Sequence, residues 1–250
     1  MANHFMLRWI QRYADRQRAL GLKRCDDWIG QAVAELAPEC LVDVGCGDGD
    51  FLFRYLKKVP REFHGVEGMA SRQAKAEKLG IKVVGCDLNG RWPFEDGKFD
   101  VVFSSQVIEH LHNTRMFVEE AYRVLKRGGT AVIASENLSS LLNCFALCLG
   151  FTPFSLMQVC GRYLGNPLGL HDQEPFPEVV PMDLPAYSGI TGHVRVMTVR
   201  QAKELFVATG FETDARSVSI LPLPDAVSRM LEGAGVRNRG HFLVVKARKP

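Results

Sequence analysis

The segment Leu41–Asp50 (LVDVGCGDGD) places Gly45, Gly47 and Gly49 at alternate positions directly after a short apolar run. Glycine lacks a Cβ, so these positions permit a tight strand-to-helix turn and let a ligand lie against the main chain. In a doubly wound α/β sheet, ligands bind beyond the carboxyl ends of the strands, next to the first strand. The segment therefore predicts both a fold class and the place of a binding site.

Short β-branched runs alternate with helical patterns along most of the chain. The runs predicted as strands are 40–44, 63–66, 81–87, 99–105, 130–135, 211–220 and 241–248. The segments predicted as helices are 28–36, 51–59, 71–79, 114–129 and 198–211, and Asp26 and Asp27 are placed to cap the first. This alternation is typical of βαβ units around a parallel sheet, so one α/β domain over residues 1–250 is expected.

The composition is that of an ordinary globular protein. The chain has 250 residues, 46% hydrophobic and 24% charged, which suits one large globular domain. A net charge of +3 is too small to indicate a nucleic-acid partner. The seven cysteines show no zinc-ligand spacing and several fall in predicted strands or apolar helices, so we expect reduced thiols and a cytoplasmic location.

Residues 1–38 are expected to form a helical cap on the domain. Met6, Trp9, Ile10 and Tyr13 repeat at helical spacing between arginines, which also leave no apolar stretch typical of a secretory signal. A solvated amphipathic helix is favoured over an arm for a membrane surface or nucleic acid, because such charged faces usually contact water.

Acidic residues around the glycine turn indicate the kind of ligand. Asp50 stands where the dinucleotide fingerprint GxGxxG has its third glycine. Asp48 and Asp50 would also compete with a diphosphate for main-chain N–H groups at a helix N-terminus. A ligand with a positive centre suits this lining better. The alternative interpretation is that the turn binds a dinucleotide, as in an NAD(P)-dependent oxidoreductase.

Further acids follow the second and third predicted strands. Glu67 stands where a carboxylate can accept hydrogen bonds from both hydroxyls of a ribose, as it would also in an NAD enzyme. Met69 is placed to lie against an adenine ring, and Asp87 to accept from the adenine amino group. The order of these residues indicates a nucleoside ligand.

Five motifs occur in series along the chain: VDVGCGDGD, GVEG, GCDLN, FDVVFSSQVIEHLHN followed by FVEEAYRVLKRGGTAVIASEN, and GHVRVMTVRQAKELFVATGFE. In this order they resemble the motifs of the class I S-adenosylmethionine-dependent methyltransferases, particularly the small-molecule, methyltransferase type 11-like branch. The resemblance implies an α/β, Rossmann-like, doubly wound seven-stranded sheet in the order 3-2-1-4-5-7-6. Strand seven would be antiparallel, with an insertion between strands five and six.

The resemblance also implies the cofactor, S-adenosyl-L-methionine, and the side chains around it. The implied cofactor-binding residues are Asp43, Gly45, Cys46, Gly47, Glu67, Gly68, Met69, Asp87, Leu88 and Gln106. Asp43, Gly45 and Gly47 would line the methionine part, and Gln106 would approach the sulfonium. Glu67 would hold the ribose, and Asp87 and Leu88 the adenine.

Residues 138–197 are predicted to be an apolar, Pro- and Gly-rich insertion that acts as a lid. No charge occurs from Asn137 to Gly161, but polar and helix-breaking residues interrupt the run, so no membrane span is expected. The helical spacing predicts a short buried helix with apolar positions at Leu141, Leu142, Phe145 and Leu149. A dimer contact, or membrane-surface docking through 138–165, remains an alternative to the lid.

The chemistry of methyl transfer asks mainly for positioning, because the positive sulfur already activates the methyl group. Holding the acceptor in line with the S–CH₃ bond supplies about 7–11 kcal/mol, so no covalent catalytic triad is required. If the acceptor is protonated, a general base is needed; His110 and His171 are the candidate catalytic residues, and His193 is a further possible base. Glu109, His110 and His112 are possible metal ligands, but no further ligand is clustered with them in the sequence, so no metal site is expected.

We therefore expect S-adenosylmethionine-dependent methyl transfer by in-line displacement to a small, partly apolar acceptor. A catalytically silent protein that binds the cofactor is the non-enzymatic alternative. Nucleic-acid methylation is not expected, because SSQV, and no NPPY-type motif, follows the fourth strand.

Overall fold

The computed structural model describes residues 2–156, 165–166, 192–234, 236 and 238–250. Its sheet has seven strands in the order β3-β2-β1-β4-β5-β7-β6, and β7 runs antiparallel to both neighbours. The strands are β1 (Cys40–Val44), β2 (Glu62–Val66), β3 (Lys82–Val84), β4 (Phe99–Ser105), β5 (Leu125–Glu136), β6 (Glu212–Val218) and β7 (Phe242–Arg248). The predicted fold class, strand order and direction of strand seven are confirmed.

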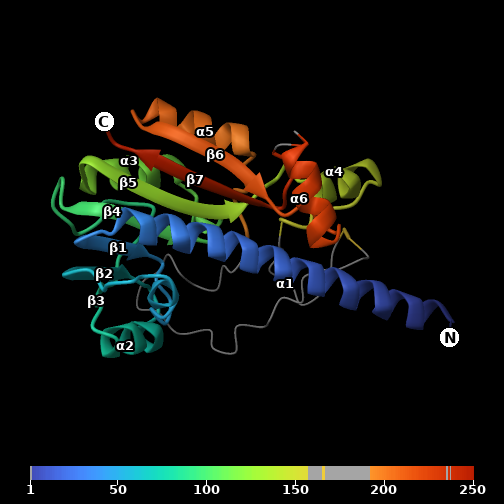
Figure 1. Ribbon diagram of the computed structural model, residues 1–250, viewed down its shortest axis with the longest axis horizontal. Coiled ribbons are helices and arrows are strands. Elements are labelled where there is room, and N and C mark those ends of the chain that lie inside the picture. Colours follow the sequence, from blue (N-terminus) through green and yellow to red (C-terminus); the bar gives the residue numbers. More distant parts are fainter. Residues whose placement is uncertain (1, 157–164, 167–191, 235, 237) are drawn as a thin grey trace.

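Helices cover both faces of this sheet (Figure 1). The helices are α1 (Ala2–Leu36), α2 (Ala70–Lys78), α3 (Thr114–Val124), α4 (Leu141–Cys148), α5 (Val199–Ala208) and α6 (Asp225–Gly233), with short 3₁₀ turns η1 (Leu52–Arg54) and η2 (Ile108–His110). Alternate strand residues enter opposite cores: Val42 packs in the core with α3 and α5, and Leu41 in the core with α1 and α2. The three-layer arrangement leaves the carboxyl ends of the strands free to build a site.

The N-terminal helix is longer than the sequence pattern predicts. Helix α1 is continuous over 35 residues, so Asp26 and Asp27 do not cap a separate helix. Cys25 and Ile29 are both fully buried, and Asp27 is held within the helix surface by Lys23 Nζ at 2.6 Å and Tyr55 Oη at 3.0 Å. Burial of one face therefore overrides the local capping signal, and the amino-terminal end of α1 projects beyond the sheet (Figure 1).

The predicted helix over 51–59 is wrong. Only the three residues of η1 are helical there, in a 3₁₀ turn. The Tyr55 ring packs directly against Gly30 of α1, and a Cβ on that glycine would overlap the ring. Contact with α1 shapes this segment, whose apolar spacing alone favoured an α-helix.

Two other helix boundaries differ from the sequence pattern. Helix α3 ends at Val124, because Leu125 already pairs with Phe99 as the first residue of β5. Helix α6 follows β6 and was not expected from the sequence.

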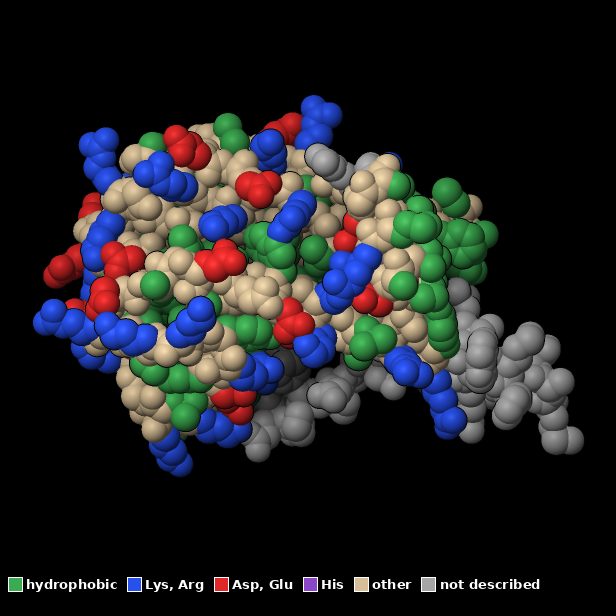
Figure 2. All heavy atoms as spheres, viewed as in Figure 1, with side chains coloured by type: hydrophobic (Ala, Val, Ile, Leu, Met, Phe, Trp, Pro, Cys, Tyr) green, Lys and Arg blue, Asp and Glu red, His purple; other side chains and the backbone are tan. Residues whose placement is uncertain are grey.

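The predicted burial of the helix at 141–149 is wrong on one face. Leu142 and Ala146 of α4 are buried. The exposed apolar residues of this segment are Leu141, Phe145, Leu147 and Leu149, with 43–56% of their surface exposed. Figure 2 shows hydrophobic side chains gathered over the end of the molecule that carries α4 and α6. Within the described residues, no helix combines the length and apolarity that a bilayer span requires.

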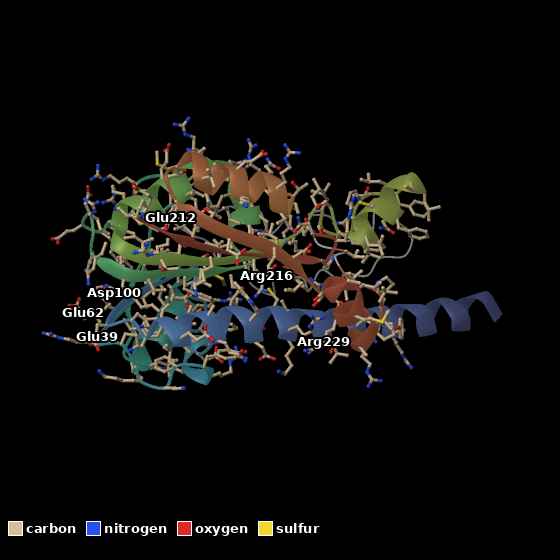
Figure 3. All side chains as sticks on the ribbon, turned by 45° about the horizontal axis from the view of Figure 1, so that its top comes forward. Glu39, Glu62, Asp100, Glu212, Arg216 and Arg229 are labelled. Carbon is tan, nitrogen blue, oxygen red and sulfur yellow. The ribbon has the colours of Figure 1, made fainter. Side chains whose placement is uncertain are left out.

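Acidic residues organise the opposite end of the sheet. Asp100 Oδ2 accepts hydrogen bonds from Glu39 N at 3.1 Å and Cys40 N at 2.8 Å, which fixes the start of β1. Glu39, Glu62 and Asp100 lie together at this amino-terminal edge (Figure 3). The edge serves the fold, and the groups described next lie at the carboxyl ends of the strands.

Candidate functional site

The glycine turn leaves β1 and closes against β2. Gly45 N and Cys46 N both donate to Val66 O, at 2.8 and 3.0 Å. Gly45, Gly47 and Gly49 all have positive φ, which L side chains rarely adopt. A Cβ on Gly45 would also collide with Val107, so the turn between β4 and η2 packs directly on bare main chain.

Glu67 lies at the carboxyl end of β2 and faces this turn. Its Oε2 accepts from Gly47 N at 2.9 Å, and its Oε1 accepts from Met69 N at 2.9 Å. Gln73 Nε2 donates to the main-chain oxygen of Glu67 at 2.5 Å. Each carboxylate oxygen has two lone-pair sites, so each retains capacity for one more donor, such as a ribose hydroxyl.

Asp43 is the second acid on the inner side of the turn. It is 3% exposed, and burial together with the nearby Glu67 carboxylate raises the pKa of Asp43 to about 8. Two acids in so little water favour a cationic ligand, because a positive charge would compensate them.

The acids at the outer side of the turn play a different part from the one predicted. Asp48 is paired with Lys75 Nζ at 2.8 Å and Asp50 is exposed, so neither faces the inner side. The case against a diphosphate rests instead on buried Asp43 and on η1. A three-residue 3₁₀ turn follows the glycines, where a dinucleotide fold places the N-terminus of an α-helix.

The remaining predicted cofactor residues surround the same edge. Gly68 and Met69 are half-buried, and Met69 is the N-cap of α2. Cys46 is buried, and burial raises the pKa of its thiol. Asp87 Oδ1 accepts from both N and Nδ2 of Asn89 at 2.9 Å, which leaves Oδ2 for another donor. The Leu88 side chain lies in the core, so at this edge Leu88 offers its main chain.

Gln106 stands where β4 ends, and its backbone is strained. Its φ is +55°, which is uncommon for a residue with a side chain, and Gln106 N donates to Ala134 O at 3.0 Å. Its Nε2 is buried without a hydrogen-bond partner among the described residues. A strained residue with an unpaired buried donor indicates a place that a ligand acceptor would complete.

Beyond Gln106, η2 brings polar groups together with a segment far along the chain. The main-chain oxygen of Glu109 accepts from Val194 N at 2.8 Å and Arg195 N at 3.0 Å. The rings of His110 and His193 meet edge to face, with centroids 4.8 Å apart. Burial and the neighbouring His193 lower the pKa of His110 to about 4, so this ring is neutral at pH 7.

A buried acid on β5 adjoins this group. Glu136 is 1% exposed on its side chain and lies 3.6 Å from Arg18 Nη2, 3.9 Å from His193 Nδ1 and 3.8 Å from His241 Nε2. Burial lowers the pKa of His241. The carboxyl ends of β4 and β5 therefore carry a polar cluster to which α1, the 192–195 segment and the start of β7 also contribute side chains.

Sequence reasoning found only part of this cluster. His110 belongs to it, whereas His112 is exposed and His171 lies outside the described residues. Glu136, Arg18 and His241 carried no local signal, because they come from distant segments. His193, in the motif GHVR, was considered as a base, but its closeness to Glu109 and His110 was not predicted.

Comparison with known proteins agrees with the fold and with the glycine turn. Residues 42–133 match the family described as "Methyltransferase domain". Ajmaline N-methyltransferase of Rauvolfia serpentina is 33% identical over 112 residues, which are 41% of this chain and 38% of that protein. Chloroplastic tocopherol O-methyltransferase of Arabidopsis thaliana is 34% identical over 113 residues, which are 40% of this chain and 32% of that protein. The chain spans less than half the length of these relatives.

A solved structure covers more of the chain. A protein of Thermotoga maritima, described as an S-adenosylmethionine-dependent methyltransferase and possible histamine N-methyltransferase, aligns over 100% of this chain and 96% of its own, with a TM-score of 0.56. The sequence identity is 19%, so the likeness shows a shared fold.

Proposed function

We propose that this chain, which belongs to the class I S-adenosylmethionine-dependent methyltransferases, transfers the methyl group of that cofactor to a small, partly apolar acceptor. The observation that carries the proposal is the pair of acids inside the glycine turn. Buried Asp43 and the Glu67 carboxylate, held by two main-chain N–H groups, form a site for a cationic nucleoside.

The site residues fit this cofactor group by group. The free lone pairs of Glu67 suit the two ribose hydroxyls, and Asp43 suits the positive charge of the methionine part. Oδ2 of Asp87 is available to the adenine amino group. The unpaired Gln106 Nε2 lies at the end of β4, toward the predicted sulfonium side, and suits the carboxylate of the methionine part or an acceptor oxygen.

The chain's own residues would act by position. The cofactor supplies an activated methyl group, and the protein has to aim the acceptor atom along the S–CH₃ bond and exclude water. The polar cluster around His110 and Glu109 forms the acceptor side, because η2 follows β4 directly beyond Gln106. No covalent intermediate is required.

The insertion over 138–197 remains our proposal for the lid on this side. Its described part supplies His193 to the cluster, and His193 Nδ1 donates to Ser155 O of the same insertion at 2.7 Å. The buried Asn143 side chain joins Ser155 to the end of β5 through bonds to Ser155 Oγ at 2.7 Å and Asn137 O at 3.0 Å. The exposed apolar side chains of α4 and the relative named for tocopherol support an acceptor with apolar parts. The relatives are named for N- and O-methylation, so the acceptor atom stays open.

A cytoplasmic location remains a prediction.

Cofactor choice is tested by binding. S-adenosylhomocysteine should raise the melting temperature of the protein, and NADH and NADPH should not. Glu67→Gln should weaken S-adenosylhomocysteine binding by about 10- to 100-fold, because hydrogen bonds to a charged group are worth about 1.5–3 kcal/mol. Glu62→Gln, at the other end of β2, is the matched control and should bind as the wild type does. A shift only with a nicotinamide cofactor would overturn the proposal.

Turnover separates an enzyme from a silent binding protein. The protein should convert S-adenosylmethionine to S-adenosylhomocysteine when amphiphilic phenols or amines are supplied, and mass spectrometry should find the acceptor heavier by one methylene unit. Tight cofactor binding with no methylated product across such a panel would favour the silent partner.

A further inference from the structure

Three groups capable of binding a metal converge at the acceptor side. Glu109, His110 and His193 each offer a ligand atom, and these atoms lie within 4.8 Å of one another. The sequence expectation of no metal rested on the lack of a further clustered ligand beside Glu109 and His110. The fold supplies that ligand as His193, from a segment more than eighty positions along the chain.

Hydrogen bonds fix how the two histidines can bind. His110 Nδ1 lies 3.3 Å from Gly192 O, and His193 Nδ1 lies 2.7 Å from Ser155 O. A carbonyl oxygen can only accept, so each Nδ1 is the donor. A histidine that donates through Nδ1 binds a metal through Nε2, which is the arrangement common to metal-binding histidines.

Glu109 gives a second, independent sign of a ligand. The residue is fully buried, and Oε2 accepts from Ser135 Oγ at 2.8 Å. Its Oε1 is buried and has no hydrogen-bond partner among the described residues. An unpaired buried carboxylate oxygen is costly, and beside two imidazole lone pairs only a proton or a cation can compensate it.

The surroundings hold these three groups in place. Val194 N and Arg195 N donate to the Glu109 main-chain oxygen, which joins the His193 segment to η2. Glu136 Oε2 lies 3.9 Å from His193 Nδ1, where it stabilises a positively charged centre. The other possible cluster, Cys40, Glu62 and His64, is weaker, because His64 Nε2 is already paired with Glu62 Oε2 at 3.3 Å.

We propose that Glu109, His110 and His193 bind one divalent first-row transition-metal ion. Two imidazoles and one carboxylate suit Mn²⁺, Fe²⁺, Co²⁺ or Zn²⁺ better than Mg²⁺ or Ca²⁺, which favour oxygen ligands. Three protein ligands leave coordination positions open for the acceptor.

The role of the ion rests on the proposed methyltransferase function. An acceptor hydroxyl bound to the ion loses its proton to water more readily, because the cation stabilises the anionic oxygen. That oxygen then forms a bond to the methyl carbon as the S–CH₃ electron pair returns to sulfur. The products are the methyl ether and neutral S-adenosylhomocysteine.

Metal binding is tested without cofactor or acceptor, so that it can fail independently of the methyltransferase proposal. Protein stripped with a chelator and dialysed is titrated with Co²⁺ while its visible d–d absorption is recorded. One ion per chain should bind, and Zn²⁺ should displace it. Glu109→Gln and His193→Ala should each weaken Co²⁺ binding by at least about tenfold, since loss of even an outer-shell partner costs 10–100-fold. His112→Ala, an exposed histidine of the same motif, should bind as the wild type does.

Two results would overturn the proposal. The first is wild-type protein that develops no Co²⁺ absorption, an outcome that needs no variant to fold. The second is Co²⁺ binding that survives both substitutions, which would place the ion elsewhere. Binding of S-adenosylhomocysteine should persist in folded Glu109→Gln, and its loss there would mean that the substitution disturbs the whole site.

Discussion

Asp43 offers a direct test of the acidic interior of the glycine turn. The residue is 3% exposed and lies in the middle of the sheet, between Gly65 of β2 and Phe103 of β4. Burial, and then the Glu67 charge, raise the pKa of Asp43 from 3.8 to about 8. At neutral pH the free protein therefore holds Asp43 in its protonated form, and Asn is a neutral replacement of nearly the same shape.

The sign of the effect on stability follows from proton binding. Between pH 4 and pH 8 the folded chain keeps this proton and the unfolded chain has lost it, so rising pH favours unfolding. Each pKa unit corresponds to about 1.4 kcal/mol. From pH 5 to pH 7, the wild type should therefore lose roughly 3 kcal/mol of unfolding free energy relative to Asp43→Asn.

Urea unfolding of both proteins at pH 5, 6 and 7, in the absence of cofactor, measures this difference. The substitution removes only the Asp43 titration, so other ionisable groups cancel in the comparison. Parallel pH dependences for the two proteins would refute the reasoning, because they would show that Asp43 is ionised in the folded state. A cationic cofactor should lower the same pKa, so its binding at pH 7 should release a proton from the wild type that Asp43→Asn does not release.

Two further predictions concern packing. Gly45→Ala should destabilise the protein by about 1–3 kcal/mol more than Gly80→Ala in urea unfolding, because both glycines have positive φ but only Gly45 faces Val107; equal effects would show that backbone strain alone matters at Gly45. Asn143→Ala should lower the free energy of unfolding by about 1–3 kcal/mol for each buried partner that it leaves unpaired, and Ser155 N–H is one of them. An unchanged urea midpoint would contradict the buried anchoring of the insertion.

The sequence predicted the parts of the fold that local patterns determine. β-branched runs such as FDVVFSS became strands at the expected places, and the helix predicted over 71–79 is α2 (Ala70–Lys78). The segment after the glycine turn differed because contact with Gly30 of α1 outweighed its apolar spacing. Likewise Asp26 and Asp27 carried a capping signal that burial of Cys25 and Ile29 overrode.

The candidate cofactor residues could be predicted from the sequence, whereas most of the cluster around Glu109 could not. Glu67 and Asp87 each follow a strand, and the order of strands in a doubly wound sheet predicts that they meet. The cluster around Glu109 has no such rule, because His193 comes from the far end of the insertion and Arg18 from α1. The spacing within EHLHN offered only His112 beside Glu109 and His110, and no metal was expected from it, whereas the tertiary fold brings His193 to them.

The main-chain hydrogen bonds of the glycine turn have a consequence for how such a chain diversifies. The hydrogen bonds to the Glu67 carboxylate and to Val66 O are donated by main-chain N–H groups, which remain when neighbouring side chains are substituted. The groups near η2 are side chains from five separate stretches of sequence, and each can be replaced singly. We therefore expect related chains to differ in their acceptors while the candidate nucleoside-binding site stays the same.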